Sequence, residues 1–573
     1  MSGKILIVGG VAGGASAAAR LRRLDESAEI IMFERGEYIS FANCGLPYYL
    51  GGVIKERNSL FLQSPQRMKE EFNLEVRVFS EVTAVDPAGK TVTVNSRKRG
   101  IYQETYDYLL LAPGAKPLRP PIEGIEHSGI LALRNVADTD AIKSRLDRPE
   151  MRRATVIGGG FIGVEMAENL RQRGLEVTLV EAVPHILAPF DSDMVVLLER
   201  EMEEKGVRLI LGDGVKAFHP LPNDVVEIEL SGGGRLQADL VILAIGVAPD
   251  TAFLKSSGLE LGPRGHLVVD DRLRTSDPAI YAVGDAVEIV DFVNGQKTAV
   301  PLAGPANLQG RIAADNLAGR ESVYRGAIGS SILQVFDLTA AATGSNERLL
   351  QRLGRSYKVA HAHPQAHASY YPGAKPMALK LIFDENGRVL GAQGIGREGV
   401  DKRIDVIATV IKLKGTVSDL VELELCYAPP YSSAKDPVNM VGYVAENILS
   451  EAYDPITYEE YLALDPNGHT LIDVRFEAEY KESHLDGALN IPLEQLRGRL
   501  AELDRDKPVV VYCKIGRRSY MAARILRPNG FKVRSLVGGY TTAIVQSFQP
   551  GPRLINPEAT APTGSWNWPE PAC

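Results

Sequence analysis

The chain has 573 residues, more than one hydrophobic core usually contains, so we expect about three or four domains. Apolar residues make up 45% of the chain and charged residues 24%, which is ordinary for a globular protein. The formal net charge of −8 argues against a nucleic-acid partner, because such proteins carry a basic face. No stretch approaches the roughly 18 consecutive apolar residues of a membrane span, and the N-terminus lacks the regions of a signal peptide. We therefore expect a cytoplasmic protein without a membrane partner.

Two segments share one pattern, in which a β-branched strand enters a glycine-rich turn and then a helix. They span residues 4–24 and 154–174, and the strands that follow them end in an acid, Glu34 and Glu181 respectively. Glycines let the backbone approach a pyrophosphate, the helix N-terminus offers free N–H groups, and the acid accepts hydrogen bonds from a ribose. Two such βαβ units predict two Rossmann-like dinucleotide-binding domains of the α/β class.

The two glycine turns do not match the dinucleotide-binding motif equally well. The second has all three expected glycines, Gly158, Gly160 and Gly163. The first keeps only the outer pair, Gly9 and Gly14, and has Val11 in the middle position. A later strand over residues 279–285 ends in Gly284 and Asp285. Ligands of open α/β sheets bind at the carboxyl ends of strands, so we interpret Asp285 as a second dinucleotide contact.

The pattern changes after residue 330. Residues 377–396 predict two strands joined by an "ENG" turn, and apolar positions at helical spacing predict one helix over residues 401–422. Four short strands are then predicted within residues 455–550, with helical stretches between them, which indicates a small separate α/β domain. The remaining residues, 551–573, are proline-rich and are expected to form an extended tail.

Several segments together resemble a known family. The double dinucleotide fold, "SFANCGLPYYLGG", "TSDPAIYAVGDA" and "YAPPYSSAKDPVNMVGY" resemble the coenzyme A disulfide reductase branch of the flavin disulfide reductases, which also contains NADH oxidases and peroxidases. "LIDVR", "HLDGALNIP" and "CKIGRRS" resemble a single rhodanese domain. Chains with both parts resemble fusions assigned to coenzyme A disulfide, persulfide and polysulfide reduction.

The resemblance implies a domain order and a set of cofactors. The expected domains are a discontinuous FAD-binding domain over 1–115 and 246–325, an NAD(P)H-binding domain over 116–245, an α+β dimerisation domain over 326–450 and a rhodanese-like domain over 455–550. The cofactors would be FAD and NADH or NADPH, with coenzyme A as substrate or tightly bound ligand. Residues expected to bind the cofactors are Gly9, Val11, Ala12, Gly14, Glu34, Arg35, Ala112, Gly158, Gly160, Phe161, Ile162, Gly163, Glu181, Gly246, Gly284, Asp285 and Ala303.

Four cysteines, Cys44, Cys426, Cys513 and Cys573, lie far apart in the sequence and form no CxxC pair, so zinc-binding and thioredoxin-like interpretations gain no support. Cys44 has no cysteine nearby with which to form a disulfide. The resemblance implies that it alternates between a thiolate and a mixed disulfide or persulfide. Pro47 marks a helix start directly after Cys44, and a helix N-terminus together with a flavin would favour the thiolate.

The resemblance also implies substrate contacts and a homodimer. Residues expected to bind the substrate are Ser16, Arg20, Arg23, Ser40, Asn43, Asn307 and Lys435. Arg20 and Arg23 fit a solvated basic helix face equally well on sequence alone. Tyr370 and Tyr427 resemble paired tyrosines that a partner subunit supplies near the reactive cysteine, where a phenol can hydrogen-bond a leaving thiolate. This arrangement requires two copies of the chain.

Cys513 lies between an apolar strand and a helix. The backbone N–H groups of residues 514–519 are placed to surround its sulfur as an anion-binding nest, and Arg517 and Arg518 add positive charge. Such a loop stabilises a thiolate or a persulfide. We therefore expect Cys513 to handle sulfane sulfur in the rhodanese-like domain.

Taken together, the sequence predicts a flavin-dependent pyridine-nucleotide oxidoreductase that reduces S–S bonds through Cys44 and releases a thiol, hydrogen sulfide or both. Its substrate stays open among coenzyme A disulfide, coenzyme A persulfide, glutathione persulfide and polysulfide. Glu181 favours NADH over NADPH, because a carboxylate suits a free 2′-hydroxyl and repels a 2′-phosphate. One alternative is an NADH oxidase or peroxidase that uses Cys44 as a sulfenic acid. Another is that the rhodanese part is a non-catalytic sulfur carrier.

Overall fold

The computed structural model describes residues 3–547, so the predicted tail and Cys573 lie outside the described residues. The chain forms two compact units, which we describe separately. Unit 1 comprises Met1–Pro184 and Gly212–Gly329, and unit 2 comprises His185–Leu211 and the residues from Ser330 onward.

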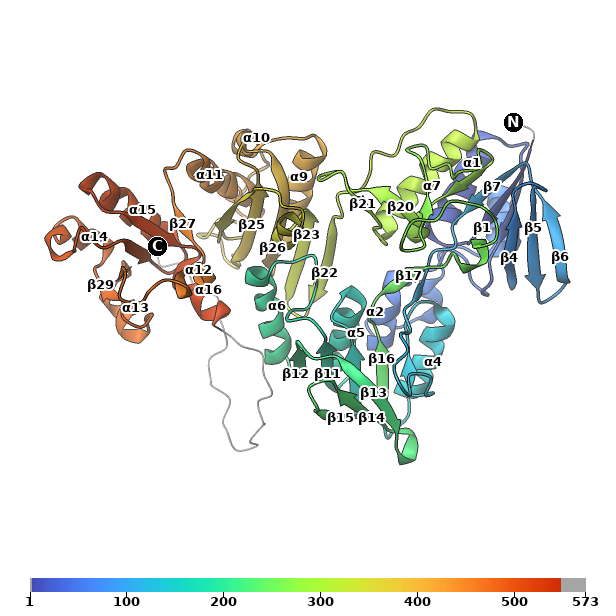
Figure 1. Ribbon diagram of the computed structural model, residues 1–573, viewed down its shortest axis with the longest axis horizontal. Helices are drawn as coiled ribbons and strands as arrows, with labels where there is room; N and C mark the ends of the chain where they lie inside the picture. The colour runs from blue at the N-terminus through green and yellow to red at the C-terminus, as the bar shows by residue number, and fades with distance from the viewer. Residues whose placement is uncertain (1–2, 548–573) are drawn as a thin grey trace. The chain divides into compact units, whose positions relative to one another are not determined.

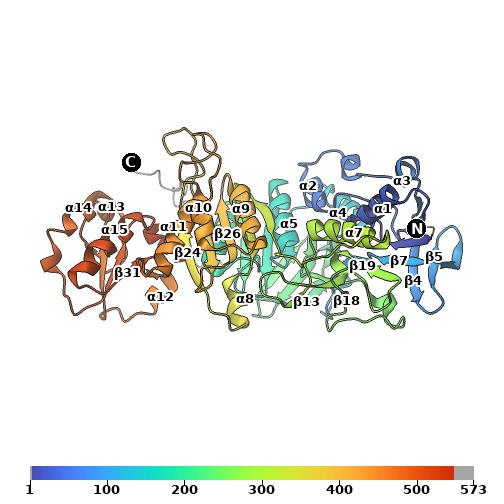
Figure 2. The same ribbon diagram turned by 90° about the horizontal axis from the view of Figure 1, so that it is seen from above.

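The first sheet of unit 1 is built from parallel strands in the order β19-β7-β1-β2-β3 (Figure 1). These strands are β1 (Lys4–Val8), β2 (Glu29–Phe33), β3 (Glu75–Arg77), β7 (Tyr108–Leu111) and β19 (Ile280–Ala282). The side chains of β1, β2, β7 and β19 are mostly buried, as expected for a parallel sheet covered on both faces, whereas β3 at the edge is partly exposed. Helix α1 (Ala12–Leu24) links β1 to β2 and packs against α7 (Ala303–Leu317), as Figure 2 also shows. The N-terminal turn and the segment around Asp285 thus share one sheet.

A second parallel sheet of unit 1 contains the strands β11-β10-β16-β9 in that order. They are β9 (Ile130–Leu131), β10 (Arg153–Ile157), β11 (Glu176–Glu181) and β16 (Leu240–Leu243), and α5 (Phe161–Gln172) links β10 to β11. Both predicted βαβ units are therefore confirmed as parallel strand–helix–strand units.

The smaller elements of unit 1 are α2 (Leu46–Gly51), α3 (Pro65–Phe72), β4 (Ser80–Asp86), β5 (Thr91–Ser96), β6 (Gly100–Thr105), β8 (Ala115–Pro117), α4 (Val136–Leu146), β13 (Val215–Pro220), β14 (Val226–Leu230), β15 (Arg235–Ala238), β17 (Val247–Pro249), β18 (Leu267–Val268), β20 (Val287–Val290) and β21 (Lys297–Thr298).

Unit 2 contains an antiparallel sheet in the order β22-β23-β26-β25-β24. Its strands are β22 (Ser331–Val335), β23 (Leu338–Gly344), β24 (Lys358–Ala362), β25 (Met377–Phe383) and β26 (Val389–Gly396). The predicted hairpin over residues 377–396 is β25 and β26. The helices of this part are α6 (Ser192–Glu204), α8 (Glu347–Arg352), α9 (Val400–Lys412), α10 (Val417–Glu422) and α11 (Pro437–Leu449), and residues Val207–Leu211 form strand β12.

The single helix predicted over residues 401–422 is wrong, because the chain forms two helices there. Helix α9 ends at Lys412, and Lys414 adopts the left-handed backbone conformation at φ 60° before Gly415. Thr416 then begins α10 with a capping box, in which its N–H donates to the Asp419 carboxylate at 2.6 Å. The glycine and the new cap interrupt a continuous apolar periodicity.

The C-terminal part of unit 2 is a parallel sheet in the order β27-β31-β30-β28-β29. The four predicted strands are β28 (Thr470–Asp473), β29 (Leu489–Asn490), β30 (Val509–Tyr512) and β31 (Val533–Leu536), and the unpredicted fifth is β27 (Pro455–Ile456). Successive residues of β30 enter different apolar clusters, Val511 with Leu526 and Tyr512 with Leu536. The helices are α12 (Tyr458–Leu462), α13 (Glu477–Glu482), α14 (Leu493–Leu496), α15 (Arg517–Leu526) and α16 (Gly539–Gln546).

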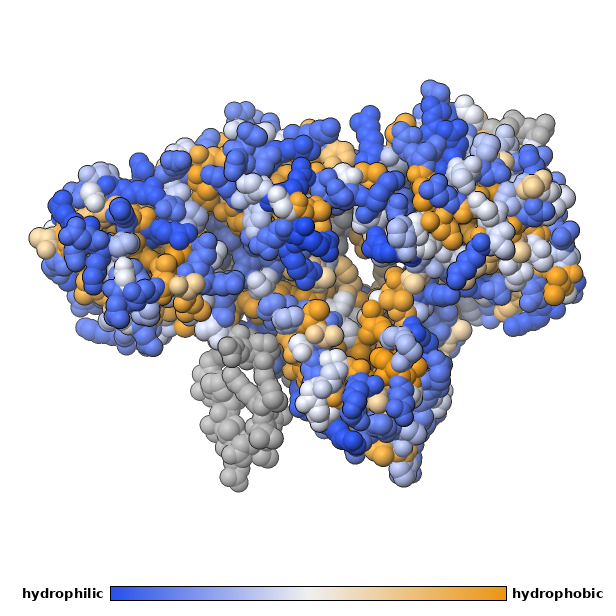
Figure 3. All heavy atoms as spheres, in the orientation of Figure 1, coloured by the Kyte–Doolittle hydropathy of each residue, from blue (hydrophilic) through white to orange (hydrophobic). Residues whose placement is uncertain are grey.

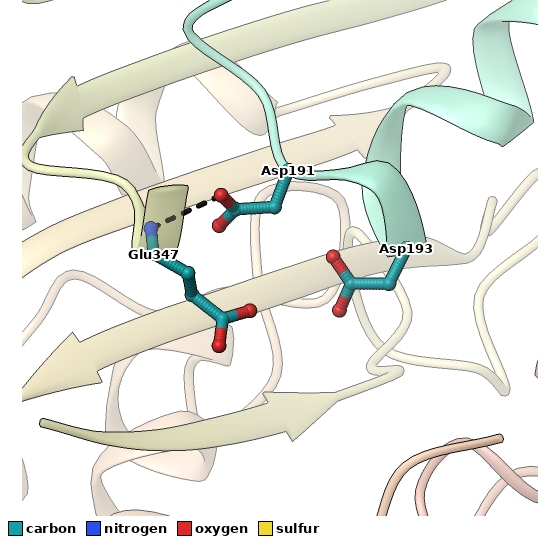
Figure 4. Close-up of side chains that lie close together, drawn as sticks. All are labelled: Asp191, Asp193 and Glu347. Atoms are coloured by element: carbon teal, nitrogen blue, oxygen red, sulfur yellow. Dashed lines mark hydrogen bonds between the residues drawn. The ribbon is translucent and has the colours of Figure 1, made fainter. Parts of the chain in front are cut away.

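Three carboxylates in unit 2 face one another, those of Asp191, Asp193 and Glu347, with oxygens within 4.8 Å (Figure 4). The Lys380 ammonium, fully buried, lies 3.1 Å from Asp191 and 2.6 Å from Asp193 and also pairs with Glu347. Burial opposes ionisation of Asp193, yet Lys380 and His361 hold the pKa of its carboxyl well below the usual range. The Lys380 ammonium thus partly offsets the charge of three carboxylates, in a cluster that joins α6 to the antiparallel sheet.

The displayed face in Figure 3 carries apolar side chains scattered among hydrophilic ones. Across residues 3–547, none of the helices combines the length and the apolar composition needed to cross a bilayer.

Candidate active site

The first glycine turn is fixed by close backbone contacts. A Cβ at Gly14 would lie 1.9 Å from the carbonyl oxygen of Gly9, so α1 packs onto the end of β1 only with glycine there. Glu34, directly after β2, accepts hydrogen bonds from the N–H groups of Gly10 and Gly36 at 3.0 and 2.8 Å. The acid therefore lies against the turn, and its expected contact with a ribose stays a prediction.

The second turn repeats this geometry. A Cβ at Gly163 would lie 1.9 Å from the carbonyl oxygen of Gly158. Glu181, the last residue of β11, accepts hydrogen bonds from the N–H groups of Gly159 and Val183 at 2.6 and 3.0 Å. Both βαβ units thus present a free helix N-terminus beside a carboxylate, which is the arrangement that binds a dinucleotide.

A cavity of about 960 Å³ opens at the carboxyl ends of β1 and β7. Its volume lies at the upper end of the range for small-molecule sites, which suits a ligand as large as a dinucleotide. Its walls contain several residues expected from the sequence: Gly9, Val11, Glu34, Arg35, Asn43 and Ala112. The size, the glycine turn and the placed carboxylate fit FAD.

The other expected cofactor residues lie at strand ends and helix starts of unit 1. Ala12, Phe161 and Ala303 are the first residues of α1, α5 and α7, and Ile162 follows Phe161. Gly160 precedes α5, while Gly246 and Gly284 both have positive φ, at 113° and 82°. Asp285 accepts a hydrogen bond from Arg134 at 2.8 Å, and Arg134 lines the large cavity. No motif in the sequence indicated Arg134.

Cys44 is exposed and lies in a single 3-10 turn, Asn43–Gly45, directly before α2. Pro47 is in the first turn of α2, as predicted. Neighbouring protein atoms still remove part of the thiol's hydration, and this burial, together with the charge of Glu165, raises the pKa of Cys44 against the opposing effect of Arg134. The surrounding protein groups thus disfavour the thiolate, and the expectation that a helix N-terminus and a flavin together favour it stays a prediction.

Glu165 was not singled out by sequence reasoning, and its charge acts on Cys44. It lies on α5, where it accepts a hydrogen bond from the Tyr48 hydroxyl at 3.4 Å. Burial raises the pKa of Glu165 to about 7. The Tyr48 hydrogen bond opposes this rise, and the charge of Glu168 adds to it. A carboxyl group that holds or releases a proton near neutral pH thus lies beside the reactive thiol. Its only signal in the sequence is its place on the helix of the second glycine motif.

A second cavity of unit 1, of about 360 Å³, contains the expected substrate residues Ser16, Arg20, Arg23, Ser40 and Asn307. The Arg20 guanidinium is held by Asp315 at 2.7 Å. Arg23 is exposed, as is Arg311, an unpredicted arginine one helical turn after Asn307 in the same wall. The basic face expected from the sequence is therefore part of a concave site, with the positive charge suited to phosphate groups.

The segment from Ser40 to Cys44 borders both cavities. Ser40 lines the smaller cavity and Asn43 the larger one, and Cys44 comes next. Ser40 has a backbone φ of 44°, a strained value for a non-glycine residue, and its N–H donates to the carbonyl oxygen of Gly10 at 2.8 Å. Strain of this kind persists where the surrounding structure fixes it, commonly at functional sites.

Unit 2 contains the remaining expected residues. The hydroxyl groups of Tyr370 and Tyr427 lie 2.5 Å apart, and 73% and 46% of these residues are exposed. That hydrogen bond raises the pKa of Tyr370. Lys435 and Cys426 are also exposed. The structure thus brings the predicted tyrosines together as a pair that faces solvent in the single chain.

Cys513 is buried at the end of β30, with 1% exposure. The N–H of Gly516, a residue with a φ of 103°, donates to the Cys513 sulfur at 3.2 Å, and it is one of the N–H groups expected to surround this sulfur. Arg518 forms two hydrogen bonds of 2.7 Å with Glu479. Burial lowers the pKa of Lys514. One backbone N–H of the loop thus contacts the sulfur, and the role of the loop as an anion-binding nest stays a prediction.

Comparison with known proteins defines the class. The sequence profile of the pyridine nucleotide-disulphide oxidoreductase family matches residues 3–310, and the profile of that family's dimerisation domain matches residues 331–437. A rhodanese-like domain matches residues 457–543. The chain belongs to the pyridine nucleotide-disulphide oxidoreductases, which use FAD and NAD(P)H, and it carries a C-terminal rhodanese-like domain.

Particular relatives match over most of the chain. The coenzyme A disulfide reductase of Staphylococcus aureus (strain bovine RF122 / ET3-1) is 36% identical over 77% of this chain and 100% of its own length. The crystal structure of reduced Bacillus anthracis CoADR-RHD is similar with a TM-score of 0.93 and 51% identity, over 95% of this chain and 98% of that one. An NAD-dependent persulfide reductase from A. fulgidus matches with a TM-score of 0.89 and 37% identity, over 95% and 100%.

Proposed function

We propose that this chain is an NADH-dependent reductase of coenzyme A disulfide and coenzyme A persulfide. The observation that carries the proposal is that the segment from Ser40 to Cys44 separates a cavity suited to a dinucleotide from a smaller cavity with two exposed arginines, Arg23 and Arg311. A phosphate-bearing thiol bound at those arginines has the reactive cysteine close by. Two of the relatives that match at full length carry names for disulfide or persulfide reduction, which supports the same conclusion.

The reaction is a two-electron reduction of an S–S bond. The Cys44 thiolate attacks one sulfur, the S–S bond breaks, and coenzyme A thiolate or hydrosulfide leaves as Cys44 forms a mixed disulfide or persulfide. When bound, FAD carries two electrons from NADH to this cysteine. The balance is one NADH and one proton consumed for two thiols, or for one thiol and one hydrogen sulfide. Glu165, with a pKa of about 7, holds the proton beside Cys44.

The proposal assigns the two glycine turns to the two dinucleotides. Gly9, Gly14 and Glu34 with Asp285 would hold FAD, and Gly158, Gly163 and Glu181 would hold NADH. The domain boundaries expected from the sequence form part of the same proposal. Two copies of the chain form a homodimer through residues 331–437, and each partner supplies Tyr370, Tyr427 and Lys435 to the other's cysteine site. The phenol pair there stabilises the departing thiolate.

Cys513 is proposed to act on sulfane sulfur. Its thiolate attacks the outer sulfur of a donor, the donor thiol leaves, and the sulfur stays on Cys513 as a persulfide within the loop that holds Gly516. A role as a passive carrier uses the same bond changes but passes the sulfur to another protein. An oxidase or peroxidase is not favoured, because the structural matches that cover 95% of this chain are CoADR-RHD and a persulfide reductase.

The test compares arginine variants on two disulfides. Arg311→Ala and Arg23→Ala should each raise the KM for coenzyme A disulfide by about tenfold, the scale of one charge-assisted phosphate contact, and leave turnover of a phosphate-free disulfide unchanged. The matched control is Arg272→Ala, a half-buried arginine of unit 1 that pairs with Glu321. Equal losses on both disulfides, or none on either, would overturn the assignment of the smaller cavity to coenzyme A.

A further inference from the structure

The first turn of helix α16 holds the loop that carries Cys513. The N–H of Tyr540 donates to the carbonyl oxygen of Cys513 at 2.7 Å. The N–H of Thr541 donates to the carbonyl oxygen of Lys514 at 3.0 Å. Gly539, the first residue of the helix, has a φ of 58°, and a Cβ there would lie 2.1 Å from the Cys513 carbonyl oxygen. The helix therefore fixes the two peptide groups that directly follow the thiol.

These two hydrogen bonds also determine where the next N–H groups point. In a trans peptide group the carbonyl and the N–H point in opposite directions, and the Cys513 carbonyl belongs to the same peptide group as the N–H of Lys514. The N–H groups of Lys514 and Ile515 therefore point away from α16, and neither donates to an acceptor within residues 3–547. The next N–H, that of Gly516, contacts the Cys513 sulfur at 3.2 Å. Consecutive N–H groups of this kind attract an anion.

His363, which directly follows β24 of the antiparallel sheet, packs against the turn that begins α16. A Cβ at Gly538 would lie 2.7 Å from Cε1 of the imidazole, so the ring leaves no room for a side chain at this position. Nε2 of the same ring lies 3.4 Å from the Thr542 hydroxyl. Burial, together with the charge of His361, lowers the pKa of His363 to about 4, so the ring is neutral at neutral pH.

The first turn of α16 also packs closely against α6. Met194 of α6, His363 and Thr541 of α16 line one cavity of only about 20 Å³, which leaves little room for the helix to shift. Helix α6 is in turn joined to the antiparallel sheet by the ion pair of Asp193 with Lys380. His363 therefore lies between the antiparallel sheet and the residues that hold the Cys513 loop.

We infer that His363 is a positioning residue for Cys513: it fixes the first turn of α16, which holds the Cys513 and Lys514 carbonyls and so directs the following N–H groups toward a sulfur anion. Without the imidazole, the turn at Gly538 can shift and the two peptide groups are held less firmly. The N–H groups then stabilise the anion less well. The inference rests on the proposed role of Cys513 as the sulfur-accepting thiol.

The test reads the Cys513 thiol directly in the full chain, so it does not depend on sulfur transfer. Cys513 is alkylated with iodoacetamide over a range of pH, and its peptide is quantified by mass spectrometry. The pH midpoint of the rate reports the thiolate, and the plateau at high pH reports access to this buried sulfur. In His363→Ala the midpoint should move upward by roughly half a unit, which is about threefold less thiolate near neutral pH.

Thr542→Val is a milder second variant, because it keeps the shape of the side chain and removes only the hydroxyl that meets His363. Its midpoint should move in the same direction, to about twofold less thiolate near neutral pH. If His363→Ala does not fold, judged by circular dichroism and bound flavin, Thr542→Val alone decides the test.

His469→Ala is the matched control, because it removes a half-buried imidazole of the rhodanese-like domain that lies 2.9 Å from the Asp465 carbonyl oxygen. Its midpoint should equal that of the unchanged protein. A midpoint that stays in place in the folded variants, a change confined to the plateau, or an equal shift in His469→Ala would overturn the inference. Sulfur transfer to cyanide, measured on the same preparations, separates the outcomes. A shifted midpoint without transfer in any preparation, the unchanged protein included, contradicts the role of Cys513 and leaves the positioning intact.

Discussion

Glu165 and Cys44 lie far apart in the sequence, and the fold brings them close enough for the charge of Glu165 to act on the thiol. Glu165 comes from α5 and has a pKa of about 7, and its charge raises the pKa of Cys44. Below that pH the carboxyl is protonated and neutral, and above it the carboxylate opposes formation of the thiolate. A proton is therefore available beside Cys44 in the range where leaving thiolates need one.

Replacing Glu165 should make Cys44 more acidic. In Glu165→Gln the charge that opposes the thiolate is gone at every pH, so the alkylation midpoint of Cys44 should fall by up to about one unit. The measurement is the iodoacetamide rate at the Cys44 peptide against pH, in the flavin-loaded enzyme. Glu71→Gln, on the exposed surface of α3, is the control. An alkylation midpoint of Cys44 that rises, or that equals the midpoint in the control variant, would show that Glu165 does not act on the thiol.

The residues that form single motifs could be predicted from the sequence, and those brought in by the fold could not. Glu34 and Glu181 follow their strands at the spacing of the dinucleotide-binding motif, and both lie beside the glycine turns of that motif. The charges of Arg134 and Glu165 act on Cys44 only because of tertiary packing, and neither position has a local signal. Arg311 is intermediate, because its distance of one helical turn from Asn307 makes it identifiable once Asn307 is assigned.

At the scale of elements, the turn between β1 and α1 is the most constrained feature of unit 1. A methyl group at Gly14 would meet the Gly9 carbonyl oxygen at 1.9 Å, so α1 would have to move away from the strand. Gly14→Ala should therefore yield protein without bound FAD, recognised by loss of its yellow colour and of flavin released on denaturation. Gly498→Ala, where the nearest atom would be 3.6 Å away, should retain full flavin. Normal flavin content in Gly14→Ala would contradict the assignment of this turn.

Strand β11 ends in Glu181, which accepts two backbone hydrogen bonds. A carboxylate held there favours the free 2′-hydroxyl of NADH and repels the 2′-phosphate of NADPH. We expect a higher kcat/KM for NADH than for NADPH, by about tenfold or more. Steady-state rates with each nucleotide on the same disulfide decide this, and a higher kcat/KM for NADPH would refute it.

Elements with strong local patterns were predictable, and short or interrupted ones were not. The two βαβ units and the β25–β26 hairpin follow their periodicity. The break between α9 and α10 lies within one apolar pattern, where Gly415 and the Thr416 cap outweigh the periodicity. Strand β27 has two residues, too few for any period, and it exists because it pairs with β31.

At the scale of the whole molecule, one segment belongs to a different compact unit from the one that its place in the sequence suggests. Residues 185–211 fall within the expected NAD(P)H-binding range, yet they pack in unit 2, where Asp191 and Asp193 pair with Lys380. Two long-range ion pairs to one buried lysine carry no local signature, so no sequence pattern indicates them. The rhodanese-like domain also belongs to unit 2, and Thr542 of α16 lies 3.4 Å from His363 at the end of β24.

The two cysteines should have separable roles in the intact enzyme. Cys513→Ser should leave turnover of coenzyme A persulfide within about twofold, because a small substrate reaches Cys44 directly, and should strongly reduce turnover of protein-bound persulfide. Steady-state release of hydrogen sulfide with both donors is the measurement, with Cys426→Ser as the control at an exposed, unassigned thiol. Equal loss on both donors would make Cys513 obligatory, and loss on neither would remove it from the reaction.

The most direct test of the central claim is to trap the substrate on Cys44. The enzyme is reduced with NADH, freed of nucleotide, mixed with coenzyme A disulfide, alkylated and digested, and each cysteine peptide is weighed by mass spectrometry. The account predicts coenzyme A in disulfide linkage on the Cys44 peptide, one equivalent of coenzyme A thiol released, and neither result in Cys44→Ser. A Cys44 peptide found only in alkylated form, with coenzyme A attached elsewhere or nowhere, would contradict it.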